Sequence, residues 1–341
     1  MTAKESWPEN PVRLTEWTTC GGCAAKIGAS LLSDLLQNVE TSHSAELLVG
    51  LAPFDDAAVL LLTPEIALVS TVDFFPPLVD DADDYGTIAA ANACSDIFAM
   101  GGEIRLAVNV AGFPEDFPQS TIIEIFNAAS RTVTSMGGVI AGGHTIQNPE
   151  PIFGLAVQGV VHPERVFRKG GAKCGDMLLL SKALGTGLIT SAGDKNEIAG
   201  AILGMRKTNQ AAAAALRTAG ATVHAVTDVT GFGLAGHAWE MAERSDLQII
   251  IDTSLLPLYD GALRISQTGH RTGADPKNRG YVKQFSSPDI RDEFVALVMD
   301  PQTSGGLLAA VHPDATSVLV ESGIFTLIGY CQAGSAEIVL I

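Results

Sequence analysis

The chain has 341 residues, of which 47% are hydrophobic and 17% are charged, and this composition excludes an intrinsically disordered protein. Its net charge of −17 excludes a surface built to bind nucleic acid, because phosphates require a basic footprint. No apolar run reaches the ~20 residues of a membrane span, and the first ten residues hold no apolar secretion signal. With only five cysteines, too few for a disulfide framework, we expect a cytoplasmic protein without a membrane partner.

Predicted strands and helices alternate along the first half of the chain. Runs rich in aliphatic residues predict strands at 57–62, 66–72, 105–111 and 152–161. Helical spacing and length predict helices at 29–39, 84–100 and 120–136.

A second series of elements follows a basic, glycine-containing stretch at 163–175. Its predicted strands are 177–181, 224–226, 248–251 and 307–311, and its predicted helical stretches are 198–219, 234–243 and 290–298. We therefore expect two domains of α+β or α/β class, residues 1–165 and 166–341, each large enough for its own core.

The acidic charge is concentrated in the first half. Residues 1–160 contain 20 Asp and Glu against 5 Lys and Arg, whereas residues 161–341 contain 18 against 16. Two interpretations remain open: the halves have different solvated surfaces, or some carboxylates hold divalent cations for an anionic substrate.

Glycine pairs punctuate the sequence, and each pair taken alone predicts a tight turn. They are Gly21-Gly22, Gly101-Gly102, Gly137-Gly138, Gly142-Gly143 and Gly305-Gly306. None belongs to a Walker-type or Gly-x-Gly-x-x-Gly phosphate-binding motif, so the two commonest nucleotide-binding folds are not indicated.

Several aspartates stand next to apolar elements. Asp55-Asp56 precede a predicted strand, Asp73 follows one, and Asp96 lies in an apolar helix one turn after Asn92. A buried charge without a partner is very costly, so each needs a cap, an ion pair or a ligand. Because the first 160 residues hold so few basic residues, we favour contact with a metal ion or a nucleotide.

The segment from Thr18 to Ile27 carries two thiols, Cys20 and Cys23, followed by Lys26. Zinc is a poor interpretation because no second Cys/His pair has ligand spacing. A lysine near a thiol favours the nucleophilic thiolate, and such a loop could close over a bound phosphate. A surface loop with incidental cysteines remains the alternative.

Taken in order, these segments resemble one family along nearly the whole chain: the selenophosphate synthetases, also called selenide, water dikinases. The matching segments after the Cys/Lys loop include FDDAAV at 54–59, STVDFF at 70–75, SDIFAMGG at 95–102, AGGHT at 141–145, TDVTGFGL at 227–234 and DPQTSGG at 300–306. The resemblance implies synthesis of selenophosphate from selenide, ATP and water, with release of AMP and orthophosphate. It also implies Mg²⁺ as cofactor, a homodimer, and a two-domain aminoimidazole-ribonucleotide-synthetase-like (PurM-like) fold whose N-terminal domain binds ATP and metal; it leaves room for a selenium-delivery protein as partner.

The resemblance also assigns site residues. Cys23 and Lys26 correspond to the family's catalytic residues, and Asp56, Asp96 and Asp228 to its Mg²⁺ ligands. The nucleotide contacts correspond to Lys26, Asp55, Asp73, Asp96, Gly143, His144 and Thr145. The chain departs from many members at Ala25, where they have a second cysteine, while Cys20 is an additional thiol.

Two other functions stay open at this point. A related kinase of the same superfamily, such as thiamine-monophosphate kinase, would share the metal-binding aspartates but not the Cys23/Lys26 loop. A carrier of selenium or thiol compounds could keep the fold without catalysing a reaction.

Overall fold

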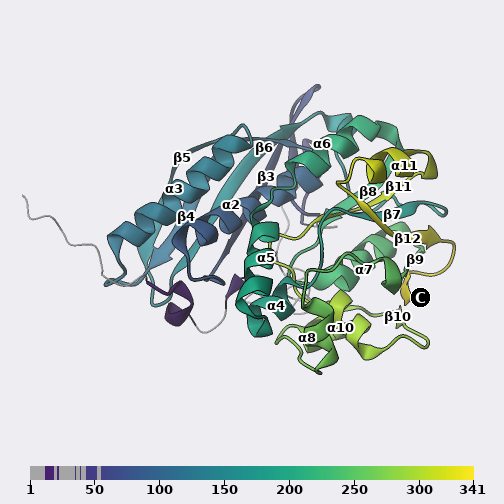
Figure 1. Ribbon diagram of the computed structural model, residues 1–341. Helices are drawn as coiled ribbons and strands as arrows, with labels where there is room; N and C mark the ends of the chain where they lie inside the picture. Colours follow the sequence, from purple (N-terminus) through teal and green to yellow (C-terminus); the bar gives the residue numbers. More distant parts are fainter. Residues whose placement is uncertain (1–11, 19–20, 23–34, 36–38, 40–43, 52–54) are drawn as a thin grey trace, which may run out of the picture.

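The computed structural model describes residues 12–18, 21–22, 35, 39, 44–51 and 55–341 (Figure 1). Within these ranges, the first half forms a mixed sheet with the order β1 (Leu47–Val49), β2 (Ala58–Thr63), β3 (Ile66–Phe75), β6 (Ile152–Val161), β4 (Glu103–Phe113) and β5 (Val139–Gln147). A short 3-10 helix, Leu14–Trp17, precedes the sheet. Helices α2 (Ala82–Ala99) and α3 (Gln119–Ser135) pack together on one face of it.

Most elements expected in the first half are confirmed, with the strands at 66–72 and 105–111 extending further than predicted. The predicted helix at 29–39 lies almost entirely outside the described residues. The tight turn predicted at Gly142-Gly143 is wrong, because both glycines lie inside β5. Their φ angles are +144° and +154°, and a Cβ at Gly143 would lie 2.4 Å from the Asn109 carbonyl oxygen on β4. The pair therefore permits a close approach of two strands rather than a reversal of the chain.

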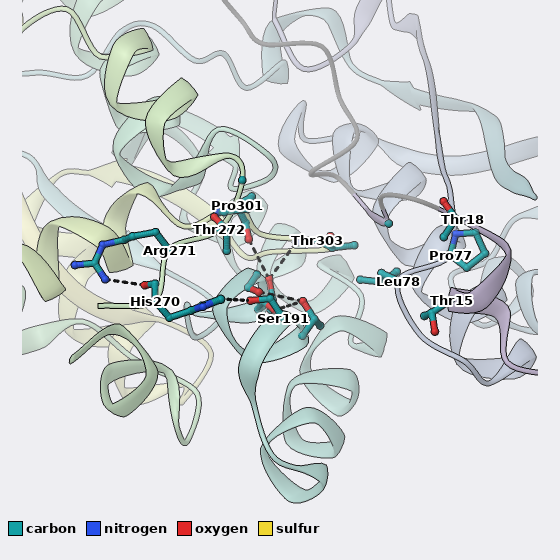
Figure 2. A pocket seen from close by; sticks show the side chains of 15 residues that line it. Thr15, Thr18, Pro77, Leu78, Ser191, His270, Arg271, Thr272, Pro301 and Thr303 are labelled. Atoms are coloured by element: carbon teal, nitrogen blue, oxygen red, sulfur yellow. Dashed lines mark hydrogen bonds between the residues drawn. The ribbon is translucent and has the colours of Figure 1, made fainter. Parts of the chain in front are cut away.

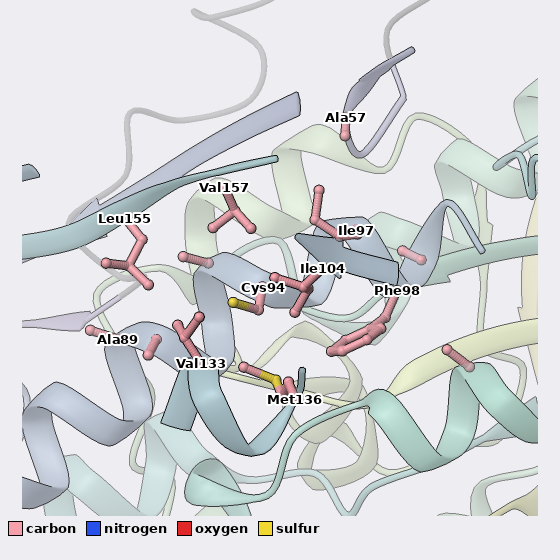
Figure 3. Close-up of a cluster of buried hydrophobic side chains, with 14 of the residues drawn as sticks. Ala57, Ala89, Cys94, Ile97, Phe98, Ile104, Val133, Met136, Leu155 and Val157 are labelled. Carbon is pink, nitrogen blue, oxygen red and sulfur yellow. The ribbon is translucent and has the colours of Figure 1, made fainter. Parts of the chain in front are cut away.

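Helix α2 is the central element of the molecule. The Asp81 carboxylate accepts a hydrogen bond from the Asp84 N–H (2.9 Å) at its beginning, and Gly101, with φ +76°, follows its end. Nearly every side of this helix is buried, since it packs against β3, β6 and α3 and also against α5, α6 and β8 of the second half. Figure 3 shows its core contacts, in which Cys94 and Phe98 lie among side chains of β4, β6 and α3.

The described part of the second half contains a seven-stranded mixed sheet. Its order is β10 (Phe285–Ser286), β13 (Glu337–Leu340), β9 (Gln248–Ile251), β12 (Thr326–Gln332), β7 (Met177–Leu180), β11 (Leu307–Val311) and β8 (Val223–Asp228). The helices are α4 (Thr186–Ala192), α5 (Lys195–Arg206), α6 (Gln210–Ala219), α7 (Gly233–Ser245), α8 (Ala262–Gln267), α9 (Asp275–Tyr281), α10 (Asp292–Met299) and α11 (Pro313–Glu321). Helix α7 packs on one face of the sheet (Figure 1), and α11 packs on β7 and β12.

The predicted helical stretch at 198–219 is two helices, α5 and α6, because Lys207 has an extended backbone. Asn209, in this break, donates hydrogen bonds to the Ser95 hydroxyl and the Gly305 carbonyl, both at 2.8 Å. One buried core also continues across the halves, joining α2 to Leu179 of β7 and Leu307 of β11. The domain division at residue 165 stays a prediction. No helix among the described residues is long and apolar enough to cross a membrane.

Candidate metal and nucleotide site

Three carboxylates that are distant in sequence meet at the junction of the two halves. Asp56 precedes β2, Asp96 lies on α2, and Asp228 is the last residue of β8. One oxygen from each carboxylate lies within 4.8 Å of the others. The structure thus brings together the three residues that the sequence predicted as metal ligands; their binding of metal stays a prediction.

The surroundings of this cluster make it unfavourable for its carboxylates to be ionised together without a cation. Burial, together with the charges of Asp228 and Asp55, raises the pKa of Asp56 to about 8, although Lys169 opposes the shift. Burial also raises the pKa of Asp96 well above its ordinary value, and neighbouring aspartates add to the effect. Among the described residues, Asp56 Oδ2 and Asp228 Oδ2 are buried and accept no hydrogen bond. An all-oxygen donor set with unsatisfied buried oxygens fits a hard cation such as Mg²⁺.

Lys169 is the residue near this cluster that sequence analysis missed. The sequence places it in the expected domain boundary, but its side chain is only 5% exposed. Its ammonium group lies 2.9 Å from Asp56 Oδ1 and 2.9 Å from Glu240 Oε2. Glu240 also accepts a hydrogen bond from the Tyr281 hydroxyl (2.9 Å) and lies 3.3 Å from His237 Nδ1. A buried chain of polar groups therefore runs from the acidic cluster into α7 and α9.

The scarcity of basic residues in the acidic half made an ion pair with its aspartates less expected, and Lys169, just beyond that half, supplies one to Asp56. The only sequence signal for it was a lysine beside two glycines in a basic stretch. Such a stretch is more often a solvated linker.

A second group of polar side chains connects α2 to β3 and to the second half. Asn92 Nδ2 donates to Asp73 Oδ2, while Asn92 Oδ1 accepts from the Ser304 N–H at 2.9 Å. Ser304 has a left-handed φ of +51°, and Lys182 donates to its carbonyl oxygen at 2.7 Å. The predicted nucleotide-binding Asp73 is therefore oriented by a turn of the second half.

Other predicted nucleotide contacts occupy different surroundings. Asp55 Oδ1 accepts from the Asp56 N–H at 2.9 Å, and Asp55 Oδ2 accepts from the Lys169 N–H at 3.1 Å. Both of its oxygens thus accept hydrogen bonds from the protein. Gly143, His144 and Thr145 lie on the exposed edge strand β5, three strand positions from β3. At about 4.8 Å a strand, β5 is about 14 Å from β3, the strand that carries Thr71 and Asp73.

The base of the Cys/Lys loop lies close to this site, whereas Cys20, Cys23 and Lys26 lie outside the described residues. The Gly22 N–H donates to the Pro76 carbonyl at 2.9 Å, and Gly22 has a φ of +64°. A Cβ at Gly21 would lie 2.2 Å from the Pro77 carbonyl oxygen, and one at Gly22 would lie 2.9 Å from Thr303 Oγ1. Only glycines fit this close approach, which fixes Gly21-Gly22 beside Thr303, the residue before Ser304.

A cavity of about 450 Å³ opens beside these glycines (Figure 2). Pro77 and Leu78 line one side, and Ser191, His270 and Thr303 line the other. The remaining residues of its lining are Thr15, Thr18, Gly21, Thr186, Gly187, Thr190, Arg271, Thr272, Gly273 and Pro301. No carboxylate is among these described lining residues, whose polar groups include threonine and serine hydroxyls and the side chains of His270 and Arg271.

Comparison with known proteins identifies the family. The sequence matches the models of the AIR synthase related protein N-terminal domain over residues 54–161 and C-terminal domain over residues 173–340. A selenide, water dikinase of Caldanaerobacter subterraneus subsp. tengcongensis is 42% identical over 315 residues, 90% of each chain. One of Myxococcus xanthus is 40% identical over 338 residues, 96% of each chain.

A solved structure has the same fold at lower identity. Thiamine-monophosphate kinase of Stenotrophomonas maltophilia superposes with a TM-score of 0.63 at 22% identity, covering 92% of this chain and 96% of that one. This likeness confirms the two-domain PurM-like fold expected from the sequence. The matches at about 40% identity along nearly full length decide the family: the chain belongs to the selenide, water dikinases.

Proposed function

We propose that this chain synthesises selenophosphate from selenide, ATP and water and releases AMP and orthophosphate. The observation that carries the proposal is the convergence of Asp56, Asp96 and Asp228 in a chain that resembles selenide, water dikinases over 90% or more of its length. Phosphoryl transfer depends chiefly on positioning and on stabilising charge, and carboxylates that hold cations are the parts it requires.

Asp56, Asp96 and Asp228 would hold Mg²⁺, which when bound neutralises charge on the transferring phosphoryl group. Neighbouring polar residues fix the position of a further carboxylate beside this cluster. Asn92, fixed by Ser304, orients the Asp73 carboxylate toward the same region. We assign nucleotide contacts to Asp73 and Asp96 because the hydrogen bonds of Asn92 and Thr71 join both to one surface between β3 and α2.

We assign the catalytic thiol to Cys23 and the catalytic cation to Lys26. The support is the position of Gly21-Gly22, which precede them in the chain and pack against Thr303 beside the site. Lys26 is also assigned to the nucleotide, together with Asp55 and with Gly143, His144 and Thr145 of β5. These last assignments rest on the family resemblance alone.

We further propose that the active form is a homodimer joined through the first sheet. Helices α2 and α3 cover one face of this sheet, and no described helix covers the other. That face exposes apolar side chains, including Leu62 (55% exposed), Val72 (56%) and Ile146 (51%). An apolar sheet face of this kind is typical of an interface between protein subunits.

Anaerobic assay of the purified protein with ATP, Mg²⁺ and selenide tests the proposed reaction. We expect AMP, orthophosphate and selenophosphate in equal amounts, with AMP formed only when selenide is present; phosphorus NMR distinguishes the products. Phosphorylation of thiamine monophosphate with release of ADP would favour the related kinase instead. Tight binding of selenide without AMP formation would favour a carrier.

A further inference from the structure

The two oxygens of the Asp56 carboxylate have different surroundings. Oδ1 lies 2.9 Å from the Lys169 ammonium group and accepts a hydrogen bond from the Thr227 hydroxyl at 3.0 Å. Oδ2 is buried and accepts no hydrogen bond from any described residue. One oxygen is therefore held by the protein, and the other is left for a ligand.

Asp96 shows the same division. Its Oδ2 accepts a hydrogen bond from the Thr71 hydroxyl of β3 at 2.5 Å. The described residues provide no hydrogen bond to its Oδ1. The third member, Asp228, has neither carboxylate oxygen in a hydrogen bond with the described residues, and its Oδ2 is buried. Two of the three carboxylates thus present a single oxygen each.

Lys169 cannot readily swing away from Asp56. Its side chain is 5% exposed, and Glu240, itself 2% exposed, holds the other side of the ammonium group at 2.9 Å. The Tyr281 hydroxyl in turn donates to Glu240 Oε1 at 2.9 Å. The Lys169 backbone N–H is also tied to Asp55 Oδ2 at 3.1 Å. Both ends of the lysine are therefore fixed before any cation arrives.

We propose that Lys169 and Thr71 are specificity-determining residues that restrict Asp56 and Asp96 to one coordinating oxygen each and so make the site select Mg²⁺ over Ca²⁺. Ca²⁺ takes six to eight oxygens and readily binds both oxygens of a carboxylate, whereas Mg²⁺ keeps an octahedral shell with few carboxylates and several waters. Holding the second oxygens removes the ligands that Ca²⁺ needs and leaves those that Mg²⁺ uses. This inference rests on the proposed metal role of the cluster.

The test is a competition experiment on the full-length protein without nucleotide, in which Mg²⁺ or Ca²⁺ displaces bound Mn²⁺. Electron paramagnetic resonance measures the Mn²⁺ that is released. We expect the wild-type protein to bind Mn²⁺ and to release it at lower Mg²⁺ than Ca²⁺ concentration. In Thr71→Val, which removes the hydroxyl but keeps the shape, the ratio of the two competition constants should shift about tenfold toward Ca²⁺. Thr71→Ser, unlike Thr71→Val, keeps a hydroxyl at this position, so it should keep the wild-type ratio.

Lys169 is tested in the double variant Lys169→Met/Glu240→Gln, because the single change would leave Glu240 as a buried charge without its lysine. We expect the same direction of shift as in Thr71→Val. Lys173→Met is the matched control, since Lys173 is an exposed lysine nearby that contacts His224 rather than the cluster. Its ratio should equal that of the wild-type protein.

The outcomes separate the inference from the function on which it rests. If wild-type protein binds Mn²⁺ and Asp228→Asn abolishes that binding, the assignment of the acidic cluster as a metal site is supported. An unchanged ratio in both Thr71→Val and the Lys169 double variant would then overturn the specificity role alone. If Mn²⁺ does not bind, or Asp228→Asn leaves its binding intact, the metal assignment fails and the inference fails with it.

Discussion

Asp300 is a residue whose burial links folding to pH. It is 1% exposed, its Oδ2 accepts from the Gly187 N–H at 3.0 Å, and burial, with the nearby charge of Asp275 adding, raises its pKa from 3.8 to about 8. Between these two values the folded protein holds one proton more than the unfolded chain. This contribution to stability is fully present below about pH 4 and is lost as the pH rises through about 8.

We expect the wild-type protein to lose stability relative to Asp300→Asn as the pH rises from 5 to 8, because an amide stays neutral throughout. Urea unfolding of both proteins at several pH values measures the difference. Asp314→Asn is the control, since Asp314 is exposed. Parallel pH profiles for wild type and Asp300→Asn would show that Asp300 titrates normally in the folded protein.

The two loop thiols differ in their distance from Lys26 along the sequence. If a helix begins near Gly22, Cys23 and Lys26 are neighbours three residues apart, and the helix N-terminus further favours a thiolate at Cys23. We expect Cys23→Ser to lose most selenide-dependent AMP formation under reducing conditions and Cys20→Ser to keep most of it. Equal losses would mean that the thiols act as a pair, and loss only in Cys20→Ser would refute the assignment.

At this scale, the sequence predicts the acidic residues well but not their protein partners. Asp56 and Asp96 stand out because an aspartate beside or within an apolar element needs a cap, an ion pair or a ligand, whereas Asp228 enters through the family's motif. Lys169 could not be predicted, because its partners Asp56 and Glu240 lie 113 and 71 residues away and only the tertiary fold unites them.

At the scale of elements, strand β5 shows where local signals mislead. Gly142 and Gly143 suggest a turn, yet the parallel pairing of β4 with β5 makes them part of the sheet. The α2 helix, by contrast, follows from its sequence, because residues 84–100 are largely apolar and have helical spacing and length. Pairing with β4 determines the structure at Gly142 and Gly143, whereas the local sequence determines that of α2.

The neighbouring glycines of β5 form a matched pair for mutation. Both have left-handed φ angles, but a Cβ at Gly143 would meet the Asn109 backbone at 2.4 Å, whereas none of the described atoms lies within 4 Å of a Cβ at Gly142. We expect Gly143→Ala to lower the free energy of unfolding by about 1–3 kcal/mol more than Gly142→Ala. If urea unfolding shows the same decrease in the free energy of unfolding for both variants, β4 and β5 separate readily enough to accommodate the Cβ.

At the scale of the whole molecule, the two halves form one functional unit. The acidic cluster takes Asp56 and Asp96 from the first half and Asp228 from the second, and the Thr303–Ser304 turn of the second half holds Asn92 on α2. Neither half alone contains the complete site. The motif order in the sequence indicates this division, but the shared core that aligns the halves is a property of the fold.

The proposed homodimer makes a prediction at the same scale. The double variant Leu62→Glu/Ile146→Glu places two charges on the open face of the first sheet, where burial against a second copy would be costly. We expect this variant to be a folded monomer by light scattering at micromolar concentration, while wild type is a dimer. Val318→Glu, on the exposed surface of α11, should remain dimeric. A monomeric wild-type protein would contradict the proposal.

Selenide-dependent AMP formation by Asp96→Asn, measured beside wild type and Asp314→Asn, tests the central claim most directly. Asn keeps the size of the side chain but removes the charge that would hold Mg²⁺, so we expect a loss on the order of 100-fold or more, with thermal unfolding showing an intact fold. Wild type and Asp314→Asn should form AMP at the same Mg²⁺-dependent rate. Full Mg²⁺-dependent AMP formation in Asp96→Asn would contradict the assignment of the acidic cluster as the centre of the reaction.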